Sequence, residues 1–169
     1  MVASARLSTA YLGIGSNVEV KRNIQCGIAA LRQAFGNLDL SPVYRSVAVG
    51  FAGEDFINLA ARIETSLSPL ELKEFLNDLE DRHGRNRELP KFSDRTLDVD
   101  ILLFDDLRLH CPGLVLPRPD ILHYAHVLRP LAELAPDVVH PVAGIPMAHL
   151  WREFAGERSG LTPSDLLDI

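Results

Sequence analysis

Apolar residues along the chain recur at helical spacing in some segments and alternate like strands in others. The first helical stripe spans residues 24–35, and Gly36 after it is typical of a helix end. Its apolar positions are Ile24, Ile28, Leu31 and Phe35. Residues 9–17, "TAYLGIGSN", alternate like a strand before a turn, where Ser16 or Asn17 is expected to cap the helix.

A second strand and a second helix are predicted between residues 56 and 84. In "FINLAARIET", residues 56–65, apolar and more polar positions alternate, which favours a strand. "SPLE", residues 68–71, combines a hydroxyl cap, a proline in the first turn and a glutamate, which together indicate a helix start. Apolar residues at helical spacing follow, and Gly84 is predicted to end the helix. Pro42, in the extended segment before this pair, predicts an edge strand or a bulge.

A nearly continuous apolar run at residues 95–104, "RTLDVDILLF", is interrupted by Asp98 and Asp100. Side chains at positions i and i+2 of a strand point to the same side, so these carboxylates are expected on one face, roughly 6.5–7 Å apart. The opposite face is predicted to anchor the strand in the core through Leu97, Val99, Ile101 and Leu103.

After a turn predicted at Asp105-Asp106, the chain shows a short strand pattern at residues 107–110 and helical patterns at 125–134 and 147–154. No internal repeat or linker divides the chain, so residues 1–169 are expected to form one domain. Helices that alternate with short, antiparallel-looking strands predict an α+β sandwich, with a sheet on one side and helices on the other.

Composition narrows the class of protein. With 169 residues, of which 47% are hydrophobic and 24% charged, the chain is typical of a soluble globular protein. It holds no run of about 18 apolar residues, so no membrane partner is expected. The first residues lack the apolar centre of a secretory signal, which favours the cytoplasm. The net charge of −6 argues against a nucleic-acid partner, and two distant cysteines support neither a disulfide framework nor a thiolate zinc site.

One segment of this acidic chain is basic. Residues 84–95, "GRNRELPKFSDR", hold four basic residues against two acidic ones. A guanidinium group donates two parallel hydrogen bonds to phosphate oxygens and keeps its charge, so the segment favours a small anionic ligand. A solvated loop is the alternative.

The paired aspartates and the basic segment together indicate magnesium and phosphate chemistry. Two close carboxylates repel each other unless a cation lies between them, and Mg²⁺ is usually bound by one or two carboxylates, waters and substrate phosphates. Arginines beside such a metal stabilise the charge that develops in phosphoryl transfer. No P-loop or Rossmann glycine motif occurs, so a nucleotide is expected to be held in another way. Aspartates that merely pair with neighbouring arginines are the alternative.

An ordered series of motifs over about residues 9–140 resembles the 6-hydroxymethyl-7,8-dihydropterin pyrophosphokinase (HPPK) family of folate biosynthesis. The series comprises "AYLGIGSN", "SPVYRS", "FINLA", "TSLSPLEL", "LEDRHGRNR", "RTLDVDILLF" and "LRPLAELAPDVVHP". The resemblance implies a ferredoxin-like fold and the Mg²⁺-dependent transfer of pyrophosphate from ATP to the hydroxymethyl group of the reduced pterin, with release of AMP. We expect ATP and the reduced pterin as the small-molecule partners. The protein is expected to be a monomer or a weak homodimer. Residues 155–169 lie outside the resemblance, as a C-terminal extension of unknown role.

Residues at the motif positions take the roles that the resemblance implies. Arg85 and Arg95 match the catalytic arginines of the family, and Asp98 and Asp100 match the ligands of two magnesium ions. The pterin pocket corresponds to Val47, Val49, Gly50, Phe56, Asn58, Phe92 and His126. The ATP contacts correspond to Asn77, Glu80, Arg87, Ile101 and Arg118. From the residues alone, an exposed strand position for Asn58 and exposed helix positions for Asn77 and Glu80 are the alternatives.

The chain departs from the family's pattern at three places. Phe92-Ser93-Asp94 stands where the family has an aromatic residue, glycine and proline, and Pro117-Arg118-Pro119 replaces a proline-histidine motif. Tyr124 and His126 stand where the family has an arginine and the phenylalanine that stacks on the pterin. These last changes motivate an alternative, a paralogue that uses the same Mg²⁺–ATP site on a different or modified pterin or another small alcohol. A non-catalytic nucleotide-binding homologue is the third hypothesis.

Overall fold

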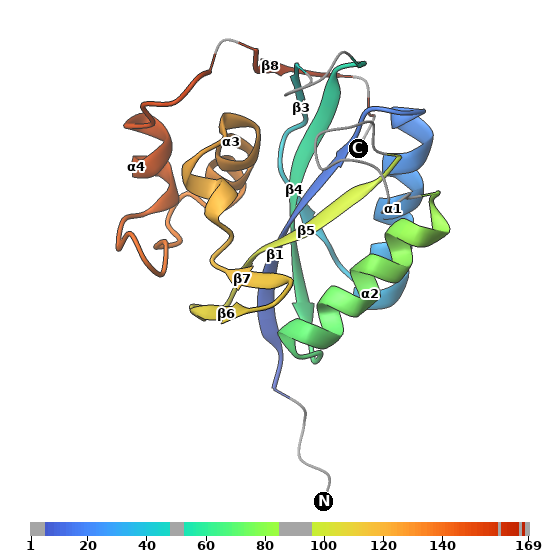
Figure 1. Ribbon diagram of the computed structural model, residues 1–169, viewed down its shortest axis with the longest axis horizontal. Coiled ribbons are helices and arrows are strands. Elements are labelled where there is room, and N and C mark those ends of the chain that lie inside the picture. The colour runs from blue at the N-terminus through green and yellow to red at the C-terminus, as the bar shows by residue number, and fades with distance from the viewer. Residues whose placement is uncertain (1–5, 48–52, 85–95, 159, 166, 168–169) are drawn as a thin grey trace, which may run out of the picture.

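Figure 1 shows the arrangement of the chain in a computed structural model, which describes residues 6–47, 53–84, 96–158, 160–165 and 167. Within these residues the main sheet has six strands, all paired antiparallel. In spatial order they are β5 (Asp98–Phe104), β1 (Ser8–Ser16), β4 (Phe56–Thr65), β3 (Tyr44–Ser46) and β8 (Thr162–Pro163), and β2 (Asp39–Leu40) also pairs with β4. A separate hairpin consists of β6 (Leu109–Cys111) and β7 (Leu114–Leu116).

Helices cover both faces of this sheet. α1 (Val20–Phe35) and α2 (Pro69–Arg82) lie on one face, and α3 (Ala125–Leu134) and α4 (Met147–Arg152) lie on the other (Figure 1). A short 3-10 helix, Pro119–Leu122, precedes α3. The order β1-α1-β3-β4-α2-β5 is the βαββαβ order of ferredoxin-like folds. The predicted α+β fold, with an antiparallel sheet and helices packed on it, is confirmed, and α3 and α4 add a second helical layer.

Each face of the sheet has its own hydrophobic core. The larger core lies on the side of α1 and α2 and includes Leu12, Ile14 and Val99. The predicted alternation in residues 56–65 is confirmed, because this core also contains Ile57, Leu59, Ala61 and Ile63. The smaller core, on the side of α3 and α4, includes Tyr11, Ala60, Leu102, Leu128 and Met147. The sheet is therefore buried on both faces over part of its length.

The start of α2 follows the local sequence signals closely. Ser68 is the N-cap, its Oγ accepts a 3.2 Å hydrogen bond from the backbone N–H of Glu71, and Pro69 is the first helical residue. The Glu71 carboxylate accepts a 2.9 Å bond from the backbone N–H of Ser68, which completes the capping box and lowers the pKa of Glu71. The helix ends at Arg82, two residues before Gly84, whose φ of +82° suits a residue without a side chain.

The start of α1 differs from its prediction. Glu19 is the N-cap, with a left-handed φ of 42° and no side-chain cap bond, so the expected capping by Ser16 or Asn17 is wrong. The hydroxyl of Ser16 instead donates to the carbonyl of Thr96 at 2.5 Å, and Nδ2 of Asn17 donates to the carbonyl of Glu54 at 3.1 Å. Both side chains bond segments that are distant in sequence, which a local pattern does not reveal.

β5 carries an irregularity that changes one predicted core contact. Its pairing with β1 shifts register between Tyr11 and Leu12, where Leu12 faces Ile101 but Tyr11 faces Leu103. A bulge of this kind inserts an extra residue and reverses the alternation beyond it. Leu97, Val99 and Ile101 therefore lie in the larger core as predicted. Leu103 lies in the smaller core with Leu102, so its predicted place is wrong.

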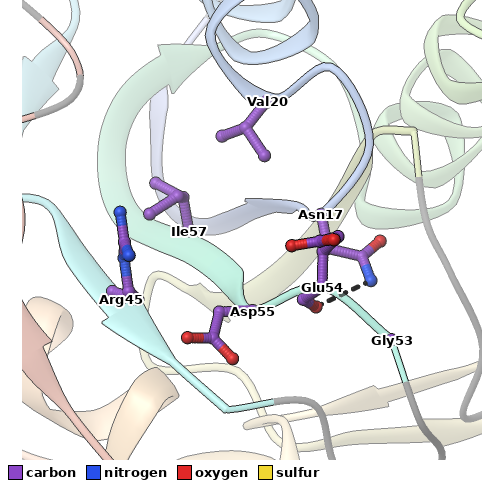
Figure 2. Close-up of a pocket in the computed structure, with 7 residues that line it drawn as sticks. All are labelled: Asn17, Val20, Arg45, Gly53, Glu54, Asp55 and Ile57. Atoms are coloured by element: carbon purple, nitrogen blue, oxygen red, sulfur yellow. Dashed lines mark hydrogen bonds between the residues drawn. The ribbon is translucent and has the colours of Figure 1, made fainter.

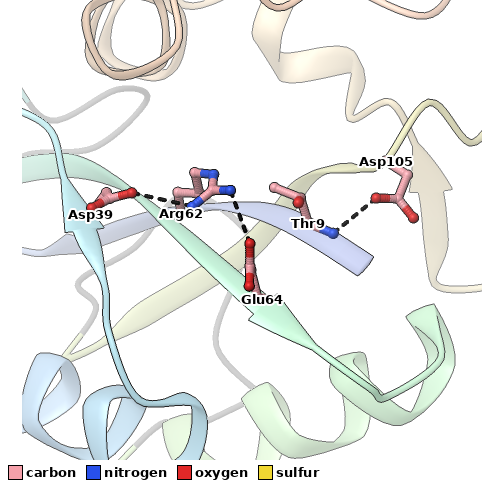
Figure 3. Close-up of polar contacts among 5 residues, drawn as sticks. All are labelled: Thr9, Asp39, Arg62, Glu64 and Asp105. Atoms are coloured by element: carbon pink, nitrogen blue, oxygen red, sulfur yellow. Dashed lines mark hydrogen bonds and ion pairs between the residues drawn. The ribbon is translucent and has the colours of Figure 1, made fainter. Parts of the chain in front are cut away.

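Polar contacts hold the end of the sheet where β1 begins and β5 ends (Figure 3). The backbone N–H of Thr9 donates to Oδ1 of Asp105 at 2.8 Å, and Asp105 begins the predicted turn with a φ of 49°. Arg62 bonds Asp39 at 3.3 Å and Glu64 at 3.1 Å. These ion pairs are at the surface, so each adds only about 0–1 kcal/mol of stability. Among the described residues, no helix combines the length and the apolar character that crossing a membrane requires.

Candidate metal and substrate site

Three carboxylates converge at the β5 edge of the sheet. The ligand atoms of Glu80, Asp98 and Asp100 all lie within 4.8 Å of one another. Asp98 and Asp100 come from alternate positions of β5 and are half-buried. Glu80 comes from the last turn of α2 and is only 2% exposed. Carboxylate oxygens at such separations form a donor set that suits a hard divalent cation.

Glu80 reaches the sheet because α2 packs against β5. Its Oε1 accepts a 3.0 Å hydrogen bond from the backbone N–H of Val99, which lies between the two aspartates. β5 is an outer strand of the main sheet, so this N–H has no neighbouring strand to bond. The helix residue satisfies the strand edge and brings its own carboxylate to the aspartates. The alternative that Glu80 faces solvent is therefore wrong.

Burial makes this concentration of negative charge costly. It raises the pKa of Asp100 to about 7, and repulsion from Asp98 adds to the shift. Arg118 opposes that shift, with Nη1 3.6 Å from Oδ1 of Asp100 and Nε donating to Oδ2 of Asp120 at 3.2 Å. Burial lowers the pKa of Arg118, but the carboxylates of Asp100 and Asp120 outweigh it and leave that pKa raised. Among the described residues, the alternative that an aspartate pairs with an arginine therefore holds for Asp100, through its 3.6 Å contact with Arg118.

A row of small and polar residues continues from the carboxylates across the sheet. Gly15 of β1 lies in register with Asp98 on one side and with Asn58 of β4 on the other. A Cβ atom on Gly15 would lie 3.0 Å from Oδ1 of Asn58, so the glycine leaves the space that the amide occupies. Nδ2 of Asn58 donates a 2.8 Å hydrogen bond to Oγ of Ser46 on β3. The amide is therefore oriented, and the backbone of Asn58 lies about 10 Å from that of Asp98, across two strand spacings.

The start of α3 lies close to the carboxylates. The rings of Tyr124 and His126 are 5.3 Å apart between centroids and tilted by 32°. Burial lowers the pKa of His126, against the opposing effect of the carboxylates of Asp120 and Asp98. The neutral form of the imidazole is thereby favoured, and the ring lies within electrostatic range of Asp120 and Asp98.

A cavity of about 340 Å³ lies elsewhere, near the start of α1 (Figure 2). It is lined by Asn17, Val20, Arg45, Gly53, Glu54, Asp55 and Ile57. Asn17 and Glu54 are bonded to each other there, and Ile57 points from β4 to the side opposite Asn58. Among the described residues, none that was predicted for the metal, the nucleotide or the pterin lines this cavity.

Comparison with known proteins decides the family. The family model of 7,8-dihydro-6-hydroxymethylpterin-pyrophosphokinase (HPPK) matches residues 11–136. The chain belongs to the HPPK family. It is 40% identical to the 2-amino-4-hydroxy-6-hydroxymethyldihydropteridine pyrophosphokinase of Synechocystis over 80% of this chain and 70% of that protein. It is 34% identical to the enzyme of the same name from Haemophilus influenzae over 89% of this chain and 95% of that protein.

Solved structures support the fold of the HPPK family. One HPPK-DHPS structure of Plasmodium falciparum matches 95% of this chain with a TM-score of 0.73 and 12% sequence identity. A second HPPK-DHPS structure from that organism matches 89% of this chain with a TM-score of 0.72. This chain spans 45% and 42% of the length of those two chains. At such low identity the likeness concerns the fold.

The structure brings four of the residues predicted for the HPPK site into contact range, namely Glu80, Asp98, Asp100 and Arg118. Phe56 and Asn58 lie on β4, and Asn77 lies half-buried on α2 one turn before Glu80. Ile101 is 2% exposed and packs in the larger core, whereas Val47 is 55% exposed after β3. Six predicted residues lie outside the described part of the chain, namely Val49, Gly50, Arg85, Arg87, Phe92 and Arg95.

Sequence reasoning missed two contributors to this site. Ser46 orients Asn58, and its only sequence signal is its place in the motif "SPVYRS". Gly15 makes room for the same amide, and a signal for it exists in "GIG", where two glycines share one face of a strand. Glycine inside a strand often marks a place where another group approaches the backbone closely.

Proposed function

We propose that this chain transfers pyrophosphate from ATP to the hydroxymethyl group of 6-hydroxymethyl-7,8-dihydropterin. The pterin oxygen forms a bond to the β-phosphorus of ATP, the bond from that phosphorus to the oxygen it shares with the α-phosphate breaks, and AMP leaves. The hydroxyl proton passes to solvent. The observation that carries the proposal is the convergence of Glu80, Asp98 and Asp100 in a chain of the HPPK family.

The donor set fits two magnesium ions bound together with ATP. All three groups are carboxylates, and burial with mutual repulsion raises the pKa of Asp100 to about 7, so a cation relieves an unfavourable charge. We assign Asp98 and Asp100 as the metal ligands, and Glu80 as the residue that holds the edge of β5 between them. Bound magnesium would neutralise the triphosphate and orient it for transfer.

The acceptor site lies along the row that begins at Asp98. Asn58 has both a donor and an acceptor in its amide, and Ser46 holds one orientation of it, which suits the hydrogen-bonding edge of a pterin. We propose that Phe56 and His126 flank the pterin ring and that Val47, Val49, Gly50 and Phe92 complete the pocket. The backbones of Asn58 and Asp98 are about 10 Å apart, and we propose that the reduced ring binds at Asn58 with its hydroxymethyl arm directed toward Asp98.

The nucleotide site lies at the opposite side of the carboxylates. Arg118 already contacts Asp100 through Nη1 and Asp120 through Nε, and a guanidinium has five N–H donors, so donors remain for a phosphate. We propose Asn77, Glu80, the backbone at Ile101, Arg87 and Arg118 as ATP contacts. Arg85 and Arg95 are the proposed catalytic arginines, which stabilise charge on the transferred and leaving groups.

The experiment that tests the proposal follows AMP release from ATP and 6-hydroxymethyl-7,8-dihydropterin with Mg²⁺. We expect one AMP and one pterin diphosphate per turnover, and no AMP when EDTA removes the metal. ATP binding without AMP release would contradict this acceptor.

A second candidate function keeps the Mg²⁺–ATP site and changes the acceptor. It is favoured by one observation, the half-buried imidazole of His126, whose pKa is lowered by burial, at the place of a stacking phenylalanine. An imidazole presents less area than a phenyl ring, and its free nitrogen can bond a polar substituent. Turnover of a modified pterin, and not of the unmodified one, supports this paralogue. Binding of ATP with no turnover of any pterin supports the non-catalytic homologue. A cytoplasmic location, a single domain and a monomer or weak homodimer without nucleic-acid or membrane partners complete the proposal.

A further inference from the structure

The chain after α4 contacts both faces of the sheet. Residues 153–158, 160–165 and 167 of this segment are described and are called the C-terminal strap below. Its strand β8 pairs with the outer edge of β3, and the N–H of Ser164 donates to the carbonyl of Val43 at 2.9 Å. Leu161 is buried on the side of α3, whereas Leu167 is buried in the larger core. The strap therefore passes around the β3 edge.

Leu161 links the two elements that hold the proposed acceptor residues. It packs in a small cluster with Tyr44 of β3 and Ala125, the first residue of α3. Tyr44 is in register with Asn58, and Ala125 precedes His126. The distance between the amide and the imidazole thus depends on how tightly this cluster is packed.

A row of alternating arginines and aromatic rings, called the ladder below, connects the strap to Tyr44. It consists of Arg158, Trp151, Arg129 and Tyr44. Arg158 lies 4.1 Å from the ring centroid of Trp151 and donates to the carbonyls of Trp151 and Phe154 at the end of α4. Arg129 of α3 lies 5.7 Å from the ring centroid of Trp151 and 4.4 Å from that of Tyr44. Each such contact between an arginine and an aromatic ring is an electrostatic attraction that favours the observed position of the ring.

The carboxylate of Glu133 bonds both Tyr44 and Arg129 at the β3 end of the ladder. Oε1 of Glu133 accepts hydrogen bonds from the hydroxyl of Tyr44 at 2.5 Å and from Nε of Arg129 at 3.1 Å. α3 is thereby bonded to β3 through Tyr44, and α4 and the strap are stacked on the other side of Arg129. The ladder belongs to neither the carboxylate cluster nor β5.

We propose that the C-terminal strap positions the acceptor half of the site, with Arg158 and Leu161 as positioning residues. The strap sets the spacing of His126 from Asn58, while Glu80, Asp98 and Asp100 are held by α2 and β5. This proposal rests on the proposed function. It predicts that loosening the strap weakens binding of the pterin and leaves binding of ATP unchanged.

The test compares Arg158→Ala with Arg152→Ala, a matched control at an exposed arginine of α4. We expect Arg158→Ala to raise the KM for the pterin about tenfold, because loss of positioning far from the chemistry weakens productive binding. The KM for ATP and kcat should stay within about twofold of the wild type, as should all constants of Arg152→Ala. Arg158→Lys, which keeps the charge and loses the planar stack, should fall between them.

The single tryptophan of the chain, Trp151, reports whether the strap has loosened. We expect a red shift of its emission in Arg158→Ala and none in Arg152→Ala. A red shift with an unchanged KM for the pterin would overturn the proposal, as would equal rises in both KM values. An Arg158→Ala protein without a red shift and with wild-type constants would overturn it too.

Failure of the proposed function would give a different result. In that case the wild type releases no AMP from the pterin, and binding of the same pterin is measured by calorimetry. Binding that is about tenfold weaker in Arg158→Ala than in Arg152→Ala still supports the strap. Equal binding by the two variants, or no binding by either, overturns it.

Discussion

The two faces of the paired strands β1 and β5 have opposite character. On the side of α1 and α2, Ile14 and Val99 are buried at 2% and 0% exposure in the larger core. On the other side, at the same end of the strands, Gly15 and Asp98 lie next to each other in register. The first face contributes to the stability of the fold through buried apolar contacts. The second face places charged groups close together. Because successive side chains of a strand point to opposite faces, one strand contributes both to the hydrophobic core and to the candidate site.

The largest effect is expected from Asp98→Ala on the charged face, which should lose activity and keep its stability. Loss of a metal ligand should lower kcat/KM at least about 1,000-fold, or roughly 4 kcal/mol of transition-state stabilisation. Asp98 is half-buried and outside both cores, so thermal unfolding should shift by only a few degrees. Steady-state kinetics and calorimetry check both expectations. Asp106→Ala, at an exposed turn residue, is the control. Activity of Asp98→Ala within threefold of the wild type would remove the metal assignment.

The opposite result is expected from Ile14→Ala on the apolar face, which should lose stability and keep its substrate binding. Removing this buried side chain should cost about 2–5 kcal/mol of unfolding free energy, because it leaves a cavity in the larger core. The protein that remains folded should keep its KM for ATP and for the pterin. Urea unfolding and kinetics at low temperature measure the two effects. Ile14→Val, with an expected cost of about 0.5–1.5 kcal/mol, serves if the first variant does not fold. A change in KM without a loss of stability would contradict the division of the faces.

The charged face should make stability depend on pH when no metal is present. The folded-state pKa of Asp100 is raised to about 7 from its ordinary value of 3.8, chiefly by burial. The folded protein therefore binds more protons than the unfolded chain between these values, and stability is lost as pH rises from about 4 to about 7. The slope should reach up to about 1.4 kcal/mol per pH unit.

Urea unfolding of the metal-free protein across this range measures the slope, with Asp100→Asn as the comparison. The asparagine does not titrate, so its curve should be flatter than that of the wild type. Mg²⁺ with ATP should restore the stability of the wild type above pH 7, because a cation stabilises the ionised carboxylate. Identical slopes for the two proteins would show that Asp100 does not carry the effect.

The smallest effect is expected from Gly15→Ala. The new methyl group would stand 3.0 Å from Oδ1 of Asn58, so the amide must shift by a few tenths of an ångström. We expect the KM for the pterin to rise about fivefold, with the KM for ATP unchanged. Gly13→Ala is the matched control on the same face, since its methyl group would meet Leu102 at 3.4 Å. Equal effects of the two variants would argue that Asn58 does not bind the acceptor.

Sequence patterns predicted correctly those elements whose stabilising contacts lie between residues close together in the chain. The capping box of α2 lies within four residues, and the alternation of β4 is a property of one strand. The same reasoning failed at α1, where Ser16 and Asn17 use their side chains for partners 80 and 37 residues away. It also placed Leu103 on the wrong face, because the bulge depends on how β5 pairs with β1.

The candidate site divides in the same way. Asp98 and Asp100 were predicted together from their spacing in one strand, and they lie at alternate positions of β5. The acidic partner Glu80 was expected only as an ATP contact, because its bond to Val99 joins a helix to a strand 19 residues on. Nothing in residues 155–169 indicated that Leu161 packs against Tyr44 and Ala125.

The amino-acid sequence by itself determined the order of β1, α1, β4, α2 and β5, the shared face of the two aspartates and membership of the HPPK family. These follow from periodicities of a few residues and from motifs that are read in order. Only the tertiary structure decided that Glu80 joins the aspartates, that Arg118 pairs with Asp100, and that Leu161 packs against Tyr44 and Ala125. Such contacts join segments far apart in the chain, and their energies come from burial and charge that no local pattern records.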